Sequence, residues 1–511
     1  MNIEFFDSIL RVLPVLVVIT LAIIQLLLGL SKEKSLKLPL LVLFVLFAVF
    51  FSFLGAGIPV KNGGAGLLFQ ADSLTWSLNF ILLSAYFLSA CLNNKQATDK
   101  SVVDSDVLMA FATSGAMLMV AAANLIVLFI GFEILSIAVY ALSGVAKKEK
   151  ASAEASLKYF ILGCFASAFM LYGFALIYGA TGNLDLAVIA KSDNTMLYLA
   201  LGLIIFGFAF KIGLMPFHYW KPDVYQGAPI TVVSFIAVVV QIAALAAFFK
   251  LLAISFIEFS AVWVPVIAGL AVLSMTVGNL LALRQDSLKR MLAYSSIAHA
   301  GYILMAFVAL KNSAELLYSS ITYYLLAYAL MTIGAFAVLM LVTGAGAEQY
   351  KKDRLMTFDG LGWERPALGF AMTLFMLSLA GIPPLVGFVG KFYVFSEVIK
   401  TDLIWLVVAA AINSVISFCY YLRVVLVMYF KTEYGVKGKK RQTKDSLDNI
   451  LATGYLKFVV TISAVCVIFF GVYAQGWTKL SELPNNLFSL KQSSKVKVDG
   501  ANMSHSVELL H

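Results

Sequence analysis

Charged side chains are scarce in this sequence of 511 residues. Asp, Glu, Lys and Arg make up 13% of it, whereas hydrophobic residues make up 61%. A typical soluble domain is about 25% charged and about 45–50% apolar, so a water-soluble globule could not bury this much apolar surface. Several soluble domains are excluded as well, because apolar runs of roughly 20 residues, the length of a membrane span, recur from end to end. The composition therefore indicates an all-α protein that crosses a membrane many times, since a membrane β-barrel would alternate polar and apolar residues.

Motifs for enzymatic chemistry are also missing. The sequence has no P-loop, no GxGxxG after a strand, no HExxH and no Ser–His–Asp set in a supporting context. Its four cysteines lie in apolar runs and form no CxxC pair, so they indicate no metal or iron–sulfur site. We expect each to pack as a small hydrophobe; they are Cys91, Cys164, Cys419 and Cys466. We expect no redox or hydrolytic chemistry in this chain itself.

Fourteen apolar runs are long enough to span a membrane. They cover residues 9–30, 38–57, 74–93, 106–123, 125–145, 155–180, 195–215, 229–254, 261–283, 291–311, 315–344, 368–399, 404–430 and 455–475. The acidic start, MNIEFFDSILRVL, enters the first run without a small-residue cleavage site, so we interpret it as a spanning helix rather than a cleaved signal.

Basic residues predict the orientation of these spans. The formal net charge is +9, and Lys and Arg concentrate in loops that follow odd-numbered spans, such as NNKQATDK, VAKKEK and LRQDSLKR. Loops on the other side, such as TGNLDLAVIAKSD, hold fewer of them. Because basic loops stay in the cytoplasm, the alternation supports a membrane topology rather than nucleic-acid binding, and it predicts both termini on the outer side.

Ionisable residues at membrane depth need a reason, because a charge at mid-bilayer costs about 2.5–3.5 kcal/mol on insertion scales. Glu133 lies in the middle of span five, and we interpret it as functional rather than as a protonated structural carboxyl. Lys158 lies near the inner end of span six, where a functional role and snorkelling to the surface both remain open. It can pair with Glu154, four residues earlier on the same helix face.

Glycine and proline interrupt two spans beside a lysine. Lys211 lies in GFAFKIGLMP of span seven, and Lys391 lies in AGIPPLVGFVGK of span twelve. Such breaks expose backbone carbonyls and admit water, which makes a buried lysine less costly. Because the two spans are five apart, the breaks have opposite orientations, as in the inverted repeats of transporters. We therefore predict two inverted repeats of five helices, spans four to eight and nine to thirteen.

Three further groups are candidates for the same path. His299 lies in AYSSIAHAGY, and since a neutral imidazole can pass a proton between its two nitrogens, proton relay and simple core packing both remain open. His218 follows the first break and is a candidate entry-side group. Lys250 lies near the outer end of span eight, where snorkelling is favoured. We hypothesise that moving Glu133 relative to Lys211 switches the proton affinity of the lysine.

Three segments resemble hallmark stretches of the antiporter-like membrane subunits of respiratory complex I, and the match is closest to the subunit N family. They are KIGLMPFHYWKPDVYQGAPITVVSF (211–235), RMLAYSSIAHAGY (290–302) and AGIPPLVGFVGKFYVF (380–395). The resemblance covers most of the chain from span four to span thirteen, and the fourteen spans agree with it.

The resemblance implies the fold and the cellular context. It implies two inverted five-helix repeats with broken helices at spans seven and twelve. We expect four parts: helices one to three (1–105), the first repeat (106–254), the second repeat (255–430), and a basic loop, the last helix and a polar tail (431–511). The implied role is proton translocation in the membrane arm of NADH-quinone oxidoreductase, in a bacterial inner membrane beside other antiporter-like and small subunits. NADH, FMN, iron–sulfur clusters and quinone are implied in partner subunits, and none in this chain.

The resemblance also assigns a proton path and shows one departure. The path residues are Glu133, Lys158, Lys211, His299 and Lys391. Related proteins carry a central lysine in span eight, where this sequence has Gln241. Glutamine can hydrogen-bond water but cannot carry a proton as a cation. Lys250, the alternative, lies nine residues further on, about 13.5 Å along the helix.

A subunit of a multi-chain Na+/H+ antiporter is the alternative function, because the same fold serves both families. The segment HYWKPDVYQGAP, which begins at His218, has the complex I form. Antiporter relatives carry an HxWLPxAHxxAP-like string there, so the segment favours the first reading.

Overall fold

The structure is a computed structural model of the chain. It describes residues 3–31, 37–57, 68–93, 100–189, 195–310, 314–344, 353–430 and 447–481. Most of the basic loop predicted after span thirteen and most of the polar tail lie outside these residues. Nearly all of the described residues are helical, which confirms the all-α fold.

The helices follow the apolar runs of the sequence. Their bounds are α1 Ile3–Ser31, α2 Lys37–Ala56, α3 Ser73–Asn93, α4 Lys100–Ala121, α5 Leu125–Ser143, α6 Lys150–Thr181, α7 Leu186–Ile189, α8 Met196–Ile212, α9 Trp220–Gly227, α10 Ile230–Phe235, α11 Gln241–Ser255, α12 Ser260–Leu283, α13 Leu288–Ala306, α14 Ala314–Thr343, α16 Leu361–Glu364, α17 Pro366–Ala380, α18 Val386–Ile399, α19 Ile404–Tyr429, α20 Leu447–Val472 and α21 Gln475–Ser481. A π-helical turn at Ile236–Val240 joins α10 to α11, so that the three segments form one continuous span.

The predicted spans are present, and the two predicted breaks are where they were expected. Within the described residues, twelve helices are long and apolar enough to cross a membrane. The remaining two spans are the interrupted ones: α8 is followed by a turn and the short α9, and α17 is followed by a turn and α18.

Both breaks begin with the same local geometry. Gly213 ends α8 with φ +78°, and Gly381 ends α17 with φ +91°, a left-handed conformation that glycine adopts without strain. The amide of the next residue then reaches back to close the helix end: Leu214 N donates to Ala209 O at 2.8 Å, and Ile382 N donates to Leu377 O at 3.0 Å. This is the hydrogen bond of a Schellman cap, and it makes the two breaks counterparts in the two repeats.

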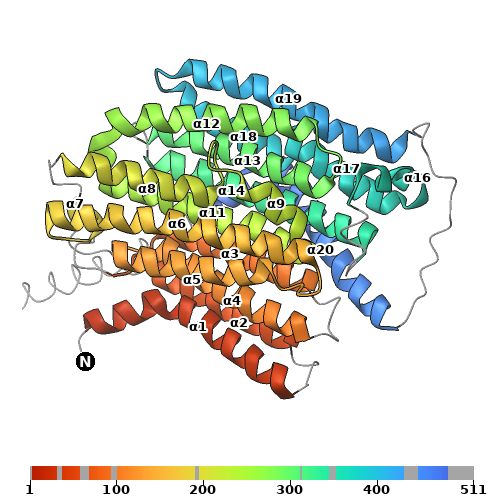
Figure 1. Cartoon of the computed structure of the whole chain (residues 1–511), viewed down its shortest axis with the longest axis horizontal. Coiled ribbons are helices and arrows are strands. Elements are labelled where there is room, and N and C mark those ends of the chain that lie inside the picture. The colour runs from red at the N-terminus through yellow and green to blue at the C-terminus, as the bar shows by residue number, and fades with distance from the viewer. Residues whose placement is uncertain are drawn as a thin grey trace, which may run out of the picture.

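Three spans form the centre of the molecule. In the spans Ile230–Ser255 and Leu288–Ala309 every residue of an apolar stretch of 18 residues is buried inside the protein, and in Leu317–Thr343 nearly every residue of such a stretch is buried. In Figure 1 the other helices lie around them, with α1 and α2 along one side of the bundle and α19 along the opposite side. Large apolar side chains are exposed on these outer helices, among them Leu46 on α2 and Val415 on α19. This is the arrangement expected where lipid or another membrane subunit covers the surface.

Loops predicted on the same side of the membrane meet in space. Residues before α13 pair with the segment before α16: Leu288 N donates to Asp353 O, and Leu355 N donates to Asp286 O, both at 2.8 Å. Both segments belong to predicted inner loops. The predicted outer turns also meet, since Leu125 N donates to Leu184 O at 2.9 Å. The alternation of the loops is therefore consistent with the count of fourteen spans.

The expectation for the cysteines is only partly right. Cys91 is buried, as expected, and Cys466 is partly buried. Cys164 on α6 and Cys419 on α19 are exposed, because both helices lie at the periphery and turn these faces outward. The thiols of these two residues therefore do not pack in the core.

Candidate functional site

Lys211 and Glu133 are brought together by α8 and α5. The Lys211 side chain is buried, and its Nζ donates to Ser136 Oγ at 2.6 Å. Ser136 lies three residues after Glu133 on α5, so the two side chains share one face of that helix. One carboxylate oxygen of Glu133, Oε1, is buried without a hydrogen-bond partner. The predicted pair is thus close in space, with Ser136 as the direct contact of the lysine.

Aromatic rings surround the Lys211 ammonium. Its Nζ lies 4.9 Å from the ring centroid of Phe132, 5.4 Å from that of Tyr140 and 5.8 Å from that of Tyr159. The negative faces of aromatic rings attract cations, and this attraction strengthens where water is excluded. The rings therefore offset part of the cost of a charged lysine at this depth.

Gln241 is the centre of a polar cluster at the start of α11. Its Oε1 accepts hydrogen bonds from Lys221 Nζ at 2.7 Å and from Ser296 Oγ at 2.6 Å. Its Nε2 donates to Ser296 O at 3.1 Å. Tyr328 OH, from α14, donates to Ser296 Oγ at 2.9 Å. Lys221 was not among the residues singled out from the sequence, yet it places an ammonium group at the position where span eight lacks a lysine.

His299 uses both of its ring nitrogens. Nδ1 lies 2.9 Å from Tyr324 OH on α14, and Nε2 lies 3.1 Å from Tyr421 OH on α19. A neutral imidazole donates through one nitrogen and accepts through the other, so the ring can link the two hydroxyls. Tyr421 OH also bonds Ser295. His299 therefore joins three helices, α13, α14 and α19, by polar contacts.

Lys391 lies beside the second break, on α18. Its Nζ donates to Ala380 O at 3.0 Å and to Ser414 Oγ at 2.9 Å, and it lies 4.7 Å from the centroid of the Tyr302 ring. The side chain is buried. Like Lys211, it combines a serine hydroxyl and an aromatic face as neighbours of the ammonium group.

Lys250 and His218 are the two remaining buried candidates. The snorkelling expected for Lys250 is not what the structure shows: the side chain is buried, and its Nζ donates to Val120 O at 3.1 Å, at the end of α4. Lys250 therefore has its own partner and does not reach the position of Gln241. His218 is buried behind the first break, with Nδ1 3.2 Å from Pro216 O, and its entry-side role stays a prediction.

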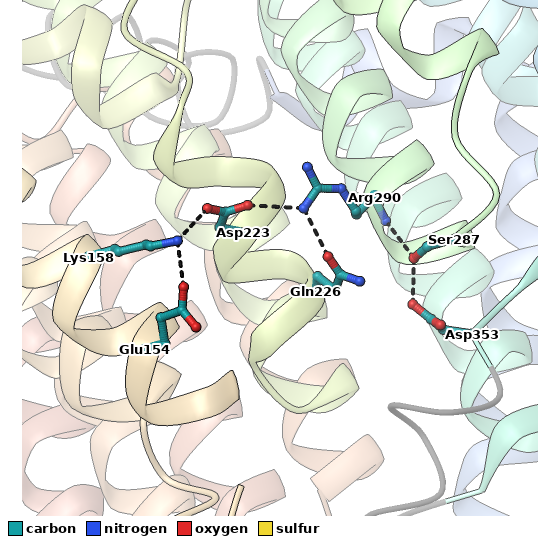
Figure 2. A network of polar contacts seen from close by, with 7 residues as sticks. All are labelled: Glu154, Lys158, Asp223, Gln226, Ser287, Arg290 and Asp353. Carbon is teal, nitrogen blue, oxygen red and sulfur yellow. Dashed lines mark hydrogen bonds and ion pairs between the residues drawn. The ribbon is translucent and has the colours of Figure 1, made fainter. Parts of the chain in front are cut away.

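Lys158 belongs to a separate network that Figure 2 shows. Its side chain is 44% exposed, and Nζ contacts Glu154 Oε1 at 2.7 Å and Asp223 Oδ2 at 2.9 Å. The first of these is the predicted pair of residues four apart. Asp223 also binds Arg290, which donates to Gln226 Oε1. Lys158 thus lies at the end of the bundle beside the inner loops, and its role in the path stays a prediction.

The buried polar groups around Lys211, Gln241, His299 and Lys391, with the hydroxyls that they contact, form a set that we call the row. Lysine, histidine, glutamate, serine and tyrosine can each donate or accept a proton or a hydrogen bond, whereas the glutamine can only bridge. Among the described residues, no group of three or more His, Cys, Asp or Glu side chains could hold a metal ion. The chemistry that the row supports is the transfer of protons.

The sequence alone did not single out Lys221, Ser136 or the two tyrosines that contact His299, although Ser295, Ser296 and Tyr302 stand out in it as polar neighbours of His299. Ser136 was detectable, because it lies one helical turn from Glu133. The tyrosines that contact His299 were not, because they lie 25 and 122 residues away in the sequence. Hydroxyls of this kind carry no signal of their own in apolar helices.

Comparison with known proteins gives consistent matches. The transmembrane family model of NADH:quinone oxidoreductase and Mrp antiporter proteins matches residues 122–417. NADH-quinone oxidoreductase subunit N from Trichlorobacter lovleyi is 41% identical over 410 residues, which cover 78% of this chain and 82% of that protein. Subunit N 1 from Thermodesulfovibrio yellowstonii is 41% identical over 393 residues, 76% of this chain and 83% of that protein.

Solved structures of the same fold come from more than one kind of complex. A chain of respiratory complex I from Thermus thermophilus matches with a TM-score of 0.74 and 32% identity, over 90% of this chain and 97% of that chain. A chain of the Mrp complex from Dietzia sp. matches with a TM-score of 0.75 over 94% of this chain and 97% of that chain. Its identity is 20%, so this likeness concerns the fold alone.

Proposed function

Because the chain belongs to the family of NADH:quinone oxidoreductase and Mrp antiporter transmembrane subunits, we propose that it is a proton-translocating membrane-arm subunit of an NADH-quinone oxidoreductase. Quinone reduction elsewhere in that complex drives protons through this chain. The chain itself carries no redox step. Its path consists of Glu133, Lys158, Lys211, His299 and Lys391.

The observation that carries this proposal is the row of buried ionisable groups at membrane depth. Lys211 and Lys391 are both buried beside a broken helix, and each contacts a serine hydroxyl. His299 lies between hydroxyl groups of two other helices. A bilayer-spanning protein keeps such costly groups only where a function needs them. Transport of protons is the function that uses all of them.

The partners and the location follow from the same proposal. We place the chain in a bacterial inner membrane, next to antiporter-like and small subunits of the membrane arm, with both termini on the outer side. NADH, FMN, iron–sulfur clusters and quinone belong to partner subunits in this proposal. The broad apolar surfaces of α1, α2, α19 and α20 are available for lipid or for those partners.

The alternative of a multi-chain Na+/H+ antiporter has weaker support. The curated relatives named subunit N are about twice as similar in sequence as the Mrp chain, at 41% against 20% identity. Mild detergent purification of the native assembly tests the choice. Co-purification of flavin and iron–sulfur subunits is expected, and recovery of small antiporter subunits alone would contradict the proposal.

Reconstituted membranes test the path itself. Part of the quinone-coupled proton uptake of the complex passes through this chain. We expect Glu133→Ala and Lys391→Ala to lower that part by at least about tenfold, because each removes a proton-transfer group. Proton uptake and quinone reduction are measured together in vesicles that contain the whole complex. Lys147→Ala is the control, since this exposed lysine lies in a loop at the end of α5. Unchanged uptake in both site variants would disprove the assignment.

A further inference from the structure

Lys221 is a buried lysine outside the proposed proton path. Its side chain is 2% exposed. Its Nζ donates to Ile212 O at 3.0 Å and to Gln241 Oε1 at 2.7 Å. The first contact lies at the end of α8, directly after Lys211, and the second lies at the start of α11. Lys221 thus connects the first break to the central span.

The position of Lys221 at its break repeats that of Lys391 at the other. Ile212 is the last residue of α8 and Ala380 is the last residue of α17. Lys221 Nζ donates to the carbonyl of the first, and Lys391 Nζ donates to the carbonyl of the second, both at 3.0 Å. Each lysine lies after its break, on α9 and α18 respectively.

The capping glycines admit both lysine side chains. A Cβ at Gly213 would lie 2.9 Å from Lys221 Cδ, and a Cβ at Gly381 would lie 3.1 Å from Lys391 Cδ. Each lysine therefore passes over the glycine that ends the preceding half-helix. This close approach is possible only without a side chain at that position.

The sequence pattern suggests a different correspondence. The string Gly-Phe-x-x-Lys precedes both Lys211 and Lys391. Lys211, however, lies on α8 before its break, whereas Lys391 lies on α18 after its break. In the structure the counterpart of Lys391 is Lys221, and Lys211 is an additional lysine of the first repeat.

Polar contacts continue from Lys221 towards the second repeat. Gln241 Oε1 accepts from both Lys221 and Ser296. Tyr328 OH donates to Ser296 Oγ, and the Tyr328 ring lies 5.5 Å from the ring of His299. The amino group of Lys221 thus lies between Lys211 and His299. It contacts Gln241, the residue that stands where related proteins have the lysine of span eight.

We propose that Lys221 is a proton-carrying residue of the translocation path and takes the place of the lysine that span eight lacks. The proposal rests on the proposed function. In this step a proton leaves the ammonium group of Lys211 and is taken up by the neutral amine of Lys221, which becomes an ammonium group. Lys221 later releases that proton towards His299 and returns to the neutral amine. Gln241 holds the amine in place and keeps its own protons.

The experiment compares variants of the whole complex in vesicles, with proton uptake and quinone reduction measured together. Lys221→Met keeps much of the volume of the side chain and removes its charge. Lys221→Arg keeps the charge but does not release a proton, since the guanidinium stays protonated. The double variant Lys221→Met with Gln241→Lys returns a lysine to span eight. Lys147→Met is the matched control on the surface.

We expect each single variant to lower proton uptake through this chain by at least about tenfold, as Glu133→Ala does. The double variant should recover most of that uptake, a result that a purely structural lysine would not produce. Full uptake in Lys221→Met, or a double variant that assembles and still pumps no better than the single one, would overturn the proposal. If Glu133→Ala and Lys391→Ala pump normally in the same vesicles, the proposed function itself fails.

Discussion

Four buried lysines place their ammonium groups on carbonyl oxygens at or next to the ends of helices. Lys221 and Lys391 bind the last carbonyls of α8 and α17, and Lys250 binds Val120 O near the end of α4. Lys289 binds Gln226 O and Ala228 O at the end of α9. The last carbonyls of a helix have no partner within it and carry the negative end of its dipole. Carbonyl oxygens at helix ends therefore help to stabilise these four lysines inside the bundle.

Gly213 tests how the first break holds its lysine. Gly213→Ala puts a Cβ at φ +78°, which costs about 1–2 kcal/mol, and the Cβ meets Lys221 Cδ at 2.9 Å. We expect a lower thermal midpoint of the purified complex and reduced proton uptake. Gly202→Ala, on the same helix, is the control, because its Cβ meets nothing within 4 Å. An equal thermal midpoint and equal proton uptake in the two variants would show that the glycine at the break is not needed to admit Lys221.

Helices α4 and α5 approach so closely that their glycines determine where Glu133 lies. A Cβ on Gly131 would lie 2.8 Å from Gly115 O, and a Cβ on Gly115 would lie 2.6 Å from Leu135 N. Small residues at a crossing let membrane helices pack backbone against backbone. Glu133, the carboxylate of the proposed path, lies two residues after Gly131, on the helix that this crossing positions.

Gly131→Val is expected to push α5 away from α4. The variant should lower the amount of assembled complex, and the complex that does assemble should pump at least several-fold less, because Glu133 moves relative to Lys211. Gly179→Val on α6 serves as the comparison, since that position is open. Yield is measured by native gel electrophoresis, and uptake in vesicles. A Gly131→Val complex with normal yield and uptake would show that the crossing does not position the carboxylate.

Polar contacts at one end of the bundle tie the two repeats together. Asp223 on α9 binds Arg290 on α13 at 3.0 Å, and the segment before α13 binds Asp353 through Ser287 at 2.5 Å (Figure 2). The side chains of Asp223 and Arg290 are partly exposed, so this ion pair contributes modestly. Asp223 and Arg290 join helices of different repeats, whereas Ser287 and Asp353 join two segments of the second repeat.

Arg290→Met removes the link between α13 and α9. We expect a loss of about 1 kcal/mol or less in stability, and a difference from the unaltered protein that shrinks as salt rises, because ions screen partly exposed pairs. Thermal unfolding of the complex at low and high salt measures it. Arg290→Lys, which keeps the charge, should behave more like the unaltered protein. An effect of Arg290→Met that grows with salt would contradict an electrostatic origin.

Hydropathy, loop charge and helix-breaking residues alone determined the spans, their alternation and the two interrupted helices, because these depend on the local sequence. They also identified Glu133, Lys211 and Lys391, since an ionisable group in an apolar run stands out by itself. Only the tertiary structure decided which side chains contact one another. The central spans are mostly apolar and are buried on all sides, so no periodic pattern of polar and apolar residues reveals which face meets which neighbour. For the same reason the burial of Lys221, the carbonyl contact of Lys250 and the tyrosines around His299 became visible only when distant helices were packed together.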